Sequence, residues 1–302
     1  MAADERPSFI LQCPVRATSA AVDWRPSPWV PTMSHRTASL RTGERAALLA
    51  TEETGALATA LAIAPHDPAG VHEARKSLRR LRSLLALARA ALGKDAVDAI
   101  DDELRAMTRD LSALRDGQVV QDMAHLLAQE ATDPGEREAW HALLPALARR
   151  HEQALASALR EDPGFMRRQA LAHRQAERLL HLPWQRLKAG DLRHALARSQ
   201  RRQARAQAQA LASGRVDDLH DWRRKSRRLR MQLSALRKLR VAPHPKGAQL
   251  PSQYITQLVD QLGVLQDLAL LHSALEALEP VHARPHRAAM RTRSASPIHP
   301  LA

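Results

Sequence analysis

The sequence predicts an all-α protein built from long helices, and three observations support this fold class. Ala, Leu and Arg, which favour helices, dominate the chain between residues 38 and 279. Apolar residues recur there at helical spacing, with few of the β-branched alternations expected of strands. Short segments rich in Pro, Gly and Asp interrupt this pattern, as they do at helix ends.

Each predicted helix ends where one of these segments begins. The first is APHDPAG at 64–70, Gly93 is the second, and TDPG at 132–135 and EDPG at 161–164 follow. Later breaks fall around His181–Pro183, at Ser213–Gly214 and over Ala242–Pro251. The predicted helices are 38–63, 69–92, 95–131, 136–160, 165–180, 191–213, 215–240 and 250–279.

The two ends of the chain lack helical patterning. Residues 1–37 are expected to be disordered or a mis-annotated extension, since the first 32 hold five Pro and helical patterning begins just after Met33, the start that we hypothesise. The apolar run Phe9–Leu11 is too short for a secretory signal. Residues 280–302 are expected to form a disordered basic tail. The helical domain is therefore expected over 38–279.

The charge of the chain points to a polyanionic partner. Lys and Arg number 46 against 32 Asp and Glu, a net charge of +14, and because only six of the 46 are Lys, forty are Arg. Such an excess favours binding to nucleic acid, an anionic membrane or a phosphate polymer. Arg also suits bidentate contact with phosphate oxygens. The alternative is a genome-wide bias toward Ala and Arg, so composition proposes a partner class without locating it.

Other classes of protein are excluded. Eight aromatic residues are too few for the stacking platforms of most single-strand binders. No run of 18 apolar residues occurs, so no transmembrane helix is expected. A single Cys13 excludes an intramolecular disulfide and a multi-cysteine zinc site, and it fits a reducing, cytoplasmic compartment.

An internal repeat is the most informative feature. VHEARKSLRRLR at 71–82 and LHDWRRKSRRLR at 219–230 share one pattern at an offset of 148 residues. Downstream of each, LSALRDGQVV at 111–120 matches LGVLQDLALL at 262–271 and pairs Asp116 with Asp267. Two ordered matches at nearly one offset predict two copies of a helical unit, about 38–160 and 165–279.

Helical geometry separates each repeated segment into an apolar stripe and a cationic flank. At 100° per residue, Val71, Ala74, Leu78, Leu81 and Leu85 fall together, while the bases share the neighbouring side. Like charges at these spacings repel, so a compensating anion is inferred. A solvated basic face is the alternative interpretation. The predicted anion-binding residues are His72, Arg75, Lys76, Arg79, Arg80, Arg82, His220, Arg223, Arg224, Arg227, Arg228 and Arg230, with Arg201, Arg202 and Arg205 as additional candidates.

These residues resemble the CHAD family, the conserved histidine α-helical domain. The resemblance rests on the two basic segments and on LRDGQVV and LQDLALL, and it covers about 38–279. It implies two antiparallel helical bundles related by an approximate twofold, with the basic helices facing one groove. It further implies binding of inorganic polyphosphate, sometimes at polyphosphate granules, without catalysis. By motif position the resemblance implies an orienting role for Asp116 and Asp267. It also implies phosphate contacts from His72, Arg75, Arg79, Arg80, Arg82, His220, Arg223, Arg224, Arg227, Arg228 and Arg230.

The sequence departs from the family pattern in three places, one of which is Lys225 at the edge of the apolar stripe. Gln118 stands where the first repeat usually has a second acid. Helix 136–160 has no counterpart after Glu279, so either the second bundle is short or residues 165–180 complete it. Nothing in the chain resembles the β-stranded triphosphate-tunnel domain to which some family members are fused.

Polyphosphate binding is therefore the first functional hypothesis, and two others compete with it. Binding to a nucleic-acid backbone rests on charge alone, because no zinc-finger spacing or RRM signature appears. A phosphohydrolase needs a nucleophile or metal, yet the chain has no P-loop and no G-x-S-x-G elbow. No catalytic residue, metal or cofactor is expected, and membrane binding is not expected because the flank beside the bases is needed for the core.

Overall fold

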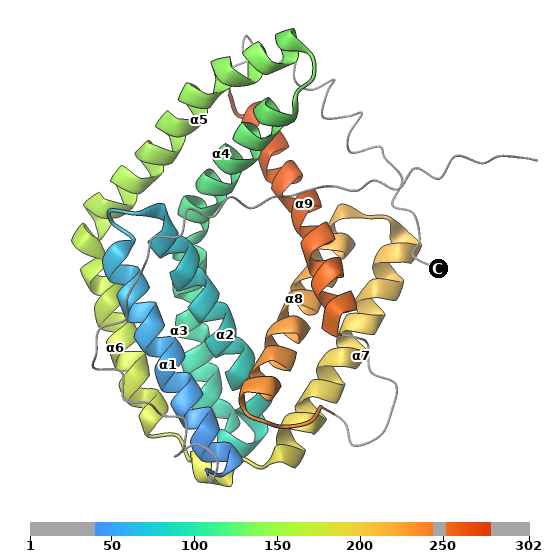
Figure 1. Cartoon of the computed structure of the whole chain (residues 1–302). Helices are drawn as coiled ribbons and strands as arrows, with labels where there is room; N and C mark the ends of the chain where they lie inside the picture. Colours follow the sequence, from blue (N-terminus) through green and yellow to red (C-terminus); the bar gives the residue numbers. More distant parts are fainter. Residues whose placement is uncertain (1–39, 244–251, 279–302) are drawn as a thin grey trace, which may run out of the picture. The chain divides into compact units, whose positions relative to one another are not determined.

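The computed structural model describes residues 40–243 and 252–278, and within them it confirms the all-α prediction. The described residues form α-helices and two short 3₁₀ turns, with no strand among them (Figure 1). The predictions for residues 1–39, 244–251 and 279–302 lie outside the described residues. The helices are α1 (Thr42–Ile63), α2 (Pro68–Leu92), α3 (Lys94–Asp110), α4 (Ser112–Glu130), α5 (Pro134–Glu161), α6 (Met166–Leu180), α7 (Ala189–Ser213), α8 (Val216–Lys238) and α9 (Ser252–Glu276).

Helix ends fall where the sequence places its breakers, because side chains there cap the free backbone N–H groups. The Asp67 carboxylate accepts from the Ala69 N–H at 2.8 Å and precedes Pro68 at the first turn of α2. Asp133 caps α5 in the same way, accepting from the Glu136 N–H at 2.8 Å. At the other end of a helix, Gly214 ends α7 in the left-handed conformation with φ 62°.

One predicted helix, 95–131, is wrong as a single element. The structure breaks it at Leu111 (φ −86°, ψ 0°) into α3 and α4. The break frees the Thr108 carbonyl, which accepts from Ser112 Oγ at 3.1 Å and from Arg75 Nη1 at 2.8 Å. No Pro or Gly marks this break, because the side chains that stabilise it come from tertiary structure.

The apolar stripe predicted for α2 forms the centre of the core. Val71, Ala74, Leu78, Leu81 and Leu85 are all buried, and α2 packs along α1. Helix α6, which lies in the second predicted unit, packs against α1 and α3. The sequence makes residues 165–180 one candidate to complete the second bundle, but in the structure they pack with the helices of the first predicted unit.

Helix α9 joins two smaller hydrophobic clusters. At one end it packs with α4 and α5, where Leu271 and Leu275 share a cluster with Trp140. At the other end it packs on α8, where Leu258 shares a cluster with Trp222 and residues of α7. Helices α2, α4, α9 and α8 thus contact one another in a closed circuit (Figure 1).

Helix α1 departs from one expectation, because it is long and apolar enough to cross a membrane by length and composition alone. The apolar residues of α1 pack against protein instead of lipid, because Leu49, Leu57 and Leu61 are buried in the core with α2 and α6. It also carries the buried carboxylate of Glu53, which forms an ion pair with Lys238 of α8 at 3.2 Å. These features are those of a core helix of a bundle.

Candidate functional site: a central arginine cluster

Five arginines from α2, α4 and α8 converge within the circuit of helices. Arg79 experiences the charges of Arg75, Arg115, Arg223 and Arg227, and Arg227 experiences those of Arg75 and Arg223. Helices α2 and α8 pack against each other and bring the two repeated segments together. We call these five residues the central arginine cluster.

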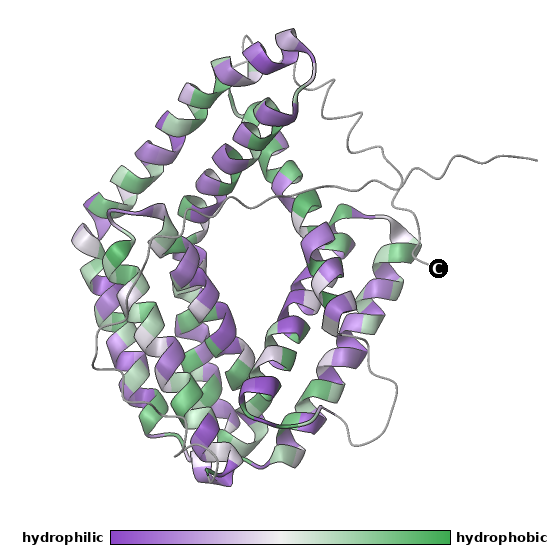
Figure 2. Cartoon of the chain, in the orientation of Figure 1, coloured by the Kyte–Doolittle hydropathy of each residue, from purple (hydrophilic) through white to green (hydrophobic). Residues whose placement is uncertain are grey.

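The local sequence explains why these side chains share one side of their helices. Arg75 and Arg79 are four positions apart on α2, as are Arg223 and Arg227 on α8, so each pair lies about one turn apart. The buried side of α8 carries Trp222 and Leu229. Figure 2 shows hydrophilic and hydrophobic residues interspersed along both helices, which fits an apolar side next to a cationic one.

Burial and mutual repulsion depress the pKa values of the two central members. Burial is the larger cause for Arg79, whose pKa falls to about 9, and the neighbouring Arg227 charge is the next. Burial likewise lowers the pKa of Arg227 to about 10, with Arg223 adding repulsion. Both guanidinium groups still carry their charge at neutral pH. The cluster is therefore a buried concentration of positive charge that is costly without an anion.

The N–H groups of this cluster are short of acceptors. No hydrogen bond or ion pair joins the Arg79 or Arg227 guanidinium to any residue that the structure describes. The buried Nε atoms of Arg75, Arg79 and Arg223 also lack a partner. Buried polar groups are nearly always hydrogen-bonded in proteins. Unpaired guanidinium donors in a shared site are what a phosphate-rich ligand would satisfy.

Two members of the cluster are held in place by neighbouring groups. Arg75 Nη1 donates to the Thr108 carbonyl at 2.8 Å and to Ser112 Oγ at 2.9 Å, which anchors its head at the break between α3 and α4. Arg115, on the first turns of α4, forms an ion pair with Asp122 at 3.7 Å. A side chain that is held before a ligand arrives loses less entropy when the ligand binds.

Asp116 and Asp267 are the carboxylates that adjoin the cluster, as their matched positions predict. The charge of Asp116 acts on Arg75, and that of Asp267 acts on Arg223. Burial raises the pKa of both carboxyls more than the nearby arginines lower it. Neither forms an ion pair within 4 Å with a described residue. Two partly desolvated carboxylates offset less than half of the charge of five arginines.

The two predicted histidines occupy different environments. His72 lies at the edge of the cluster, where burial first and the Arg115 charge second lower its pKa below the ordinary value. Its imidazole is therefore neutral at neutral pH and can donate one hydrogen bond. His220 is half-buried on α8. The charges of Arg115 and Arg79 thus reach His72.

Most of the other predicted bases have carboxylate partners outside the cluster. Arg82 binds Asp101 through two hydrogen bonds of 2.7 and 3.2 Å, and Arg230 binds Asp260 at 2.9 Å. Arg228 and Arg202 face a separate cavity, and Arg201 and Arg205 are exposed on α7. The remaining ion pairs are Lys76 with Glu73, Arg80 with Glu53, and Arg224 with Asp221.

Arg115 is the member of the cluster that the sequence analysis did not select. Arg115 directly precedes Asp116 in the motif LRDGQVV, and this position next to a matched residue is the feature of the sequence that points to it. In the second copy Gln266 takes this position, and the pattern therefore gave no matched arginine. Among the described residues, no group of three or more His, Cys, Asp or Glu side chains is placed to hold a metal ion.

The fold and the site define an all-helical protein in which the two helices of the repeated basic motif, α2 and α8, meet at a buried, acid-poor arginine cluster. The family model for the CHAD domain matches residues 45–276. The chain therefore belongs to the CHAD domain family.

Solved structures agree with this assignment at the level of the fold. The crystal structure of the CHAD domain from the plant Ricinus communis superposes with a TM-score of 0.60 at 20% identity and covers 84% of each chain. PptA from Streptomyces chartreusis superposes with a TM-score of 0.52 at 18% identity, over 78% of this chain and 100% of that one. No curated protein sequence matches the chain.

Proposed function

We propose that this protein binds inorganic polyphosphate at the central arginine cluster, without acting on it chemically. The observation that carries the proposal is the set of unpaired guanidinium groups of Arg79 and Arg227 where α2 and α8 meet, with the charge of Arg227 acting on Arg79. Membership of the CHAD family adds to it, because the family resemblance implies this ligand.

The chemistry of the polymer matches that of the cluster. A linear polyphosphate carries about one negative charge per phosphate, and the planar guanidinium group contacts two phosphate oxygens at once. Each phosphate that enters the cluster would replace repulsion between neighbouring arginines with attraction. Arg115 on α4 lies beside the pairs on α2 and α8, so the polymer would contact three helices. Oxygens in the buried part of the cluster would also accept from the Nε atoms that lack partners.

A binding experiment tests the proposal directly. Purified full-length protein is titrated with fluorescently labelled long-chain polyphosphate at fixed salt, and the double variant Arg79→Ala/Arg227→Ala is measured beside it. Because each charge-assisted contact contributes about 1.5–3 kcal/mol, the variant is expected to bind at least 100-fold more weakly. The matched control is Arg201→Ala/Arg205→Ala, which removes the same charge from the exposed side of α7 and is expected to change binding less than threefold.

Two outcomes would overturn the proposal. One is equal loss of affinity in both double variants, which would mean that net charge alone drives binding. The other is loss of the helical circular dichroism signal in the Arg79→Ala/Arg227→Ala variant, which would give these residues a structural role. Duplex DNA and RNA are included as competitors, because binding to a nucleic-acid backbone is the alternative function. Competition by DNA that equals that of polyphosphate per unit charge would favour the alternative.

Binding without catalysis and a cytoplasmic location at polyphosphate granules form part of the same proposal. Polymer recovered after incubation with the protein should keep its length on a gel. A fluorescent fusion of the full chain should gather on polyphosphate granules, and the Arg79→Ala/Arg227→Ala fusion should remain diffuse. Shortening of the polymer by the purified protein would contradict the first part, and granule association of the double variant would contradict the second.

A further inference from the structure

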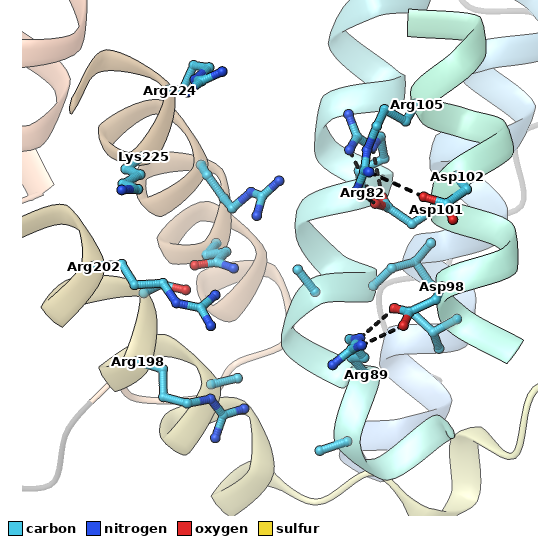
Figure 3. Close-up of a pocket in the computed structure, with 18 of the residues that line it drawn as sticks. Arg82, Arg89, Asp98, Asp101, Asp102, Arg105, Arg198, Arg202, Arg224 and Lys225 are labelled. Carbon is cyan, nitrogen blue, oxygen red and sulfur yellow. Dashed lines mark hydrogen bonds and ion pairs between the residues drawn. The ribbon is translucent and has the colours of Figure 1, made fainter. Parts of the chain in front are cut away.

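A second cationic site lies against a neighbouring side of α8, separate from the central arginine cluster. It is a cavity of about 890 Å³ between α2 and α3 on one side and α7 and α8 on the other (Figure 3). None of the five cluster residues lines it. Arg224 and Arg228, which do, project about 100° away around α8 from Arg223 and Arg227. The volume falls in the range of small-molecule binding sites.

The α2–α3 wall of this cavity is electrostatically balanced. Arg82 binds Asp101, Arg89 binds Asp98 through two hydrogen bonds, and Arg105 contacts Asp101 at 2.9 Å. Figure 3 shows these arginines beside the carboxylates of α3. Each cation on this wall has a carboxylate partner, so the wall offers few free charges to a ligand.

The α7–α8 wall has an excess of cations. Arg198, Arg202 and Arg228 form no ion pair with any described residue, while Arg224 and Lys225 share the single carboxylate of Asp221. Figure 3 shows Arg198 and Arg202 extending from α7 into the cavity. Over both walls the lining residues comprise eight Lys or Arg and four Asp, which leaves a net charge of +4.

Arg228 shows the consequence of this excess. Part of the Arg228 side chain is exposed to the cavity. Protein atoms nevertheless crowd around its guanidinium group, and this partial burial is the main cause of its lowered pKa. The charges of Arg82, Arg105 and Arg202 add to the lowering, and only Asp101 opposes them. An anion in the cavity would relieve this repulsion.

Two features distinguish the cavity from a site for phosphate alone. Ala86 and Ala90 give it an accessible apolar surface beside the charges. Gln232 also lines it, is only 1% exposed, and has an Oε1 atom without a hydrogen-bond partner. A buried amide oxygen requires a donor, which fully ionised inorganic phosphate does not have.

We propose that this cavity binds a nucleotide, with a nucleoside triphosphate as the best match. Its triphosphate carries roughly three to four negative charges near neutral pH, close to the +4 of the lining, and would contact Arg198, Arg202 and Arg228. Its base would pack on Ala86 and Ala90, and an amine or hydroxyl of the base or sugar would donate to Gln232. This site is separate from the proposed polyphosphate site and does not depend on it.

The test compares ATP with inorganic tripolyphosphate by isothermal titration calorimetry on the full chain. ATP is expected to bind one site per chain at least tenfold more tightly than tripolyphosphate. The variant Arg198→Gln/Arg202→Gln should weaken ATP at least tenfold, and Gln232→Leu should weaken ATP three- to tenfold while leaving tripolyphosphate unchanged. The control Arg201→Gln/Arg205→Gln removes the same charge from α7 outside the cavity and should leave both ligands unaffected.

Three results would overturn the inference. The absence of saturable ATP binding up to millimolar concentration would exclude the site. Equal affinity for ATP and tripolyphosphate would reduce it to a phosphate site. Loss of ATP binding in Arg79→Ala/Arg227→Ala, with none in Arg198→Gln/Arg202→Gln, would place the nucleotide in the central arginine cluster. Polyphosphate binding by Arg198→Gln/Arg202→Gln is measured in parallel, so that the two proposals can fail separately. Circular dichroism of each variant confirms that it folds.

Discussion

Arg79 and Arg82 lie three positions apart on α2 and use the same side chain in opposite ways. Arg82 meets Asp101 of α3 with two hydrogen bonds, and its side chain is 15% exposed. Arg79 has no carboxylate partner among the described residues, and after burial the like charge of Arg227 on α8 is the largest cause of its lowered pKa. The helix that packs against each position, rather than the residue itself, therefore decides whether the arginine has a carboxylate partner within the fold.

Helix α8 shows the same contrast. Arg230 is paired with Asp260 of α9 at 2.9 Å, whereas Arg227, one turn earlier, has no described carboxylate within ion-pair distance. Both helices of the repeated motif thus carry paired as well as unpaired arginines. The contrast can be tested with variants that remove a paired arginine or that give an unpaired arginine a carboxylate partner.

The largest difference is expected in stability. Arg82→Ala leaves Asp101 with Arg105 alone and should lower the free energy of unfolding by about 2–3 kcal/mol, less than for a fully buried pair because both side chains are partly exposed. Arg79→Met removes a buried, unpaired charge and should leave that free energy unchanged or raise it. Urea denaturation followed by circular dichroism measures both, and equal losses would show that the two arginines have the same structural role.

The next effect comes from supplying the central arginine cluster with the carboxylate that it lacks. Gly263 on α9 faces Arg223, and a Cβ atom added there would lie 3.6 Å from Arg223 Nη2, an ordinary contact. Gly263→Asp should therefore neutralise part of the cluster and weaken polyphosphate binding about tenfold. Gly263→Asn has the same size without the charge and is the matched control. A similar loss in both variants would mean that space, not charge, limits binding.

The sequence predicts more of the helices than of the contacts between them. Asp67–Pro68 and Asp133–Pro134 mark their helix starts because capping is local. The break at Leu111 could not be predicted, since Arg75, 36 positions away, stabilises it by binding the freed carbonyl. The hydrophobic periodicity of a helix likewise shows which of its sides is apolar, but not which neighbouring helix packs against that side.

The same limit applies to the candidate site. The repeat selects Arg79 and Arg227, whose charges converge, but it gives Arg82 and Arg230 the same weight. What separates these residues is Asp101 on α3 and Asp260 on α9, which lie 19 and 30 positions from their partners. Tertiary packing brings these carboxylates into place, so spacing within the motif cannot reveal them.

A smaller effect is expected from the two carboxylates beside the cluster. Asp116→Asn/Asp267→Asn removes two negative charges and should raise polyphosphate affinity severalfold at pH 7.5. Burial raises the pKa of both groups, so acid discharges them earlier than ordinary carboxyls. Wild-type affinity should therefore increase as pH falls toward 5, and the Asn variant should show a flatter profile. Fluorescence titrations across this pH range test both parts, and an unchanged slope would mean that these carboxylates do not face the polymer.

The smallest effect concerns His72, whose folded-state pKa lies below its ordinary value of 6.5. Because the unfolded chain then binds the proton more readily, His72 contributes stability that is present above pH 6.5 and is lost as pH falls through the lowered value. His72→Gln should make the fall in melting temperature below pH 6.5 slightly shallower.

His151 provides an internal comparison for this last prediction, because burial also lowers its pKa while the charges of Glu152 and Asp122 raise it. It faces Gly117 of α4, and no arginine of the cluster acts on it. Bound polyphosphate should raise the pKa of His72 and so remove its acid sensitivity, but should leave that of His151 intact. Melting curves of His72→Gln and His151→Gln, with and without the polymer, separate the two contributions. A polymer effect that persists in His72→Gln but disappears in His151→Gln would place the ligand against α5 rather than between α2 and α8.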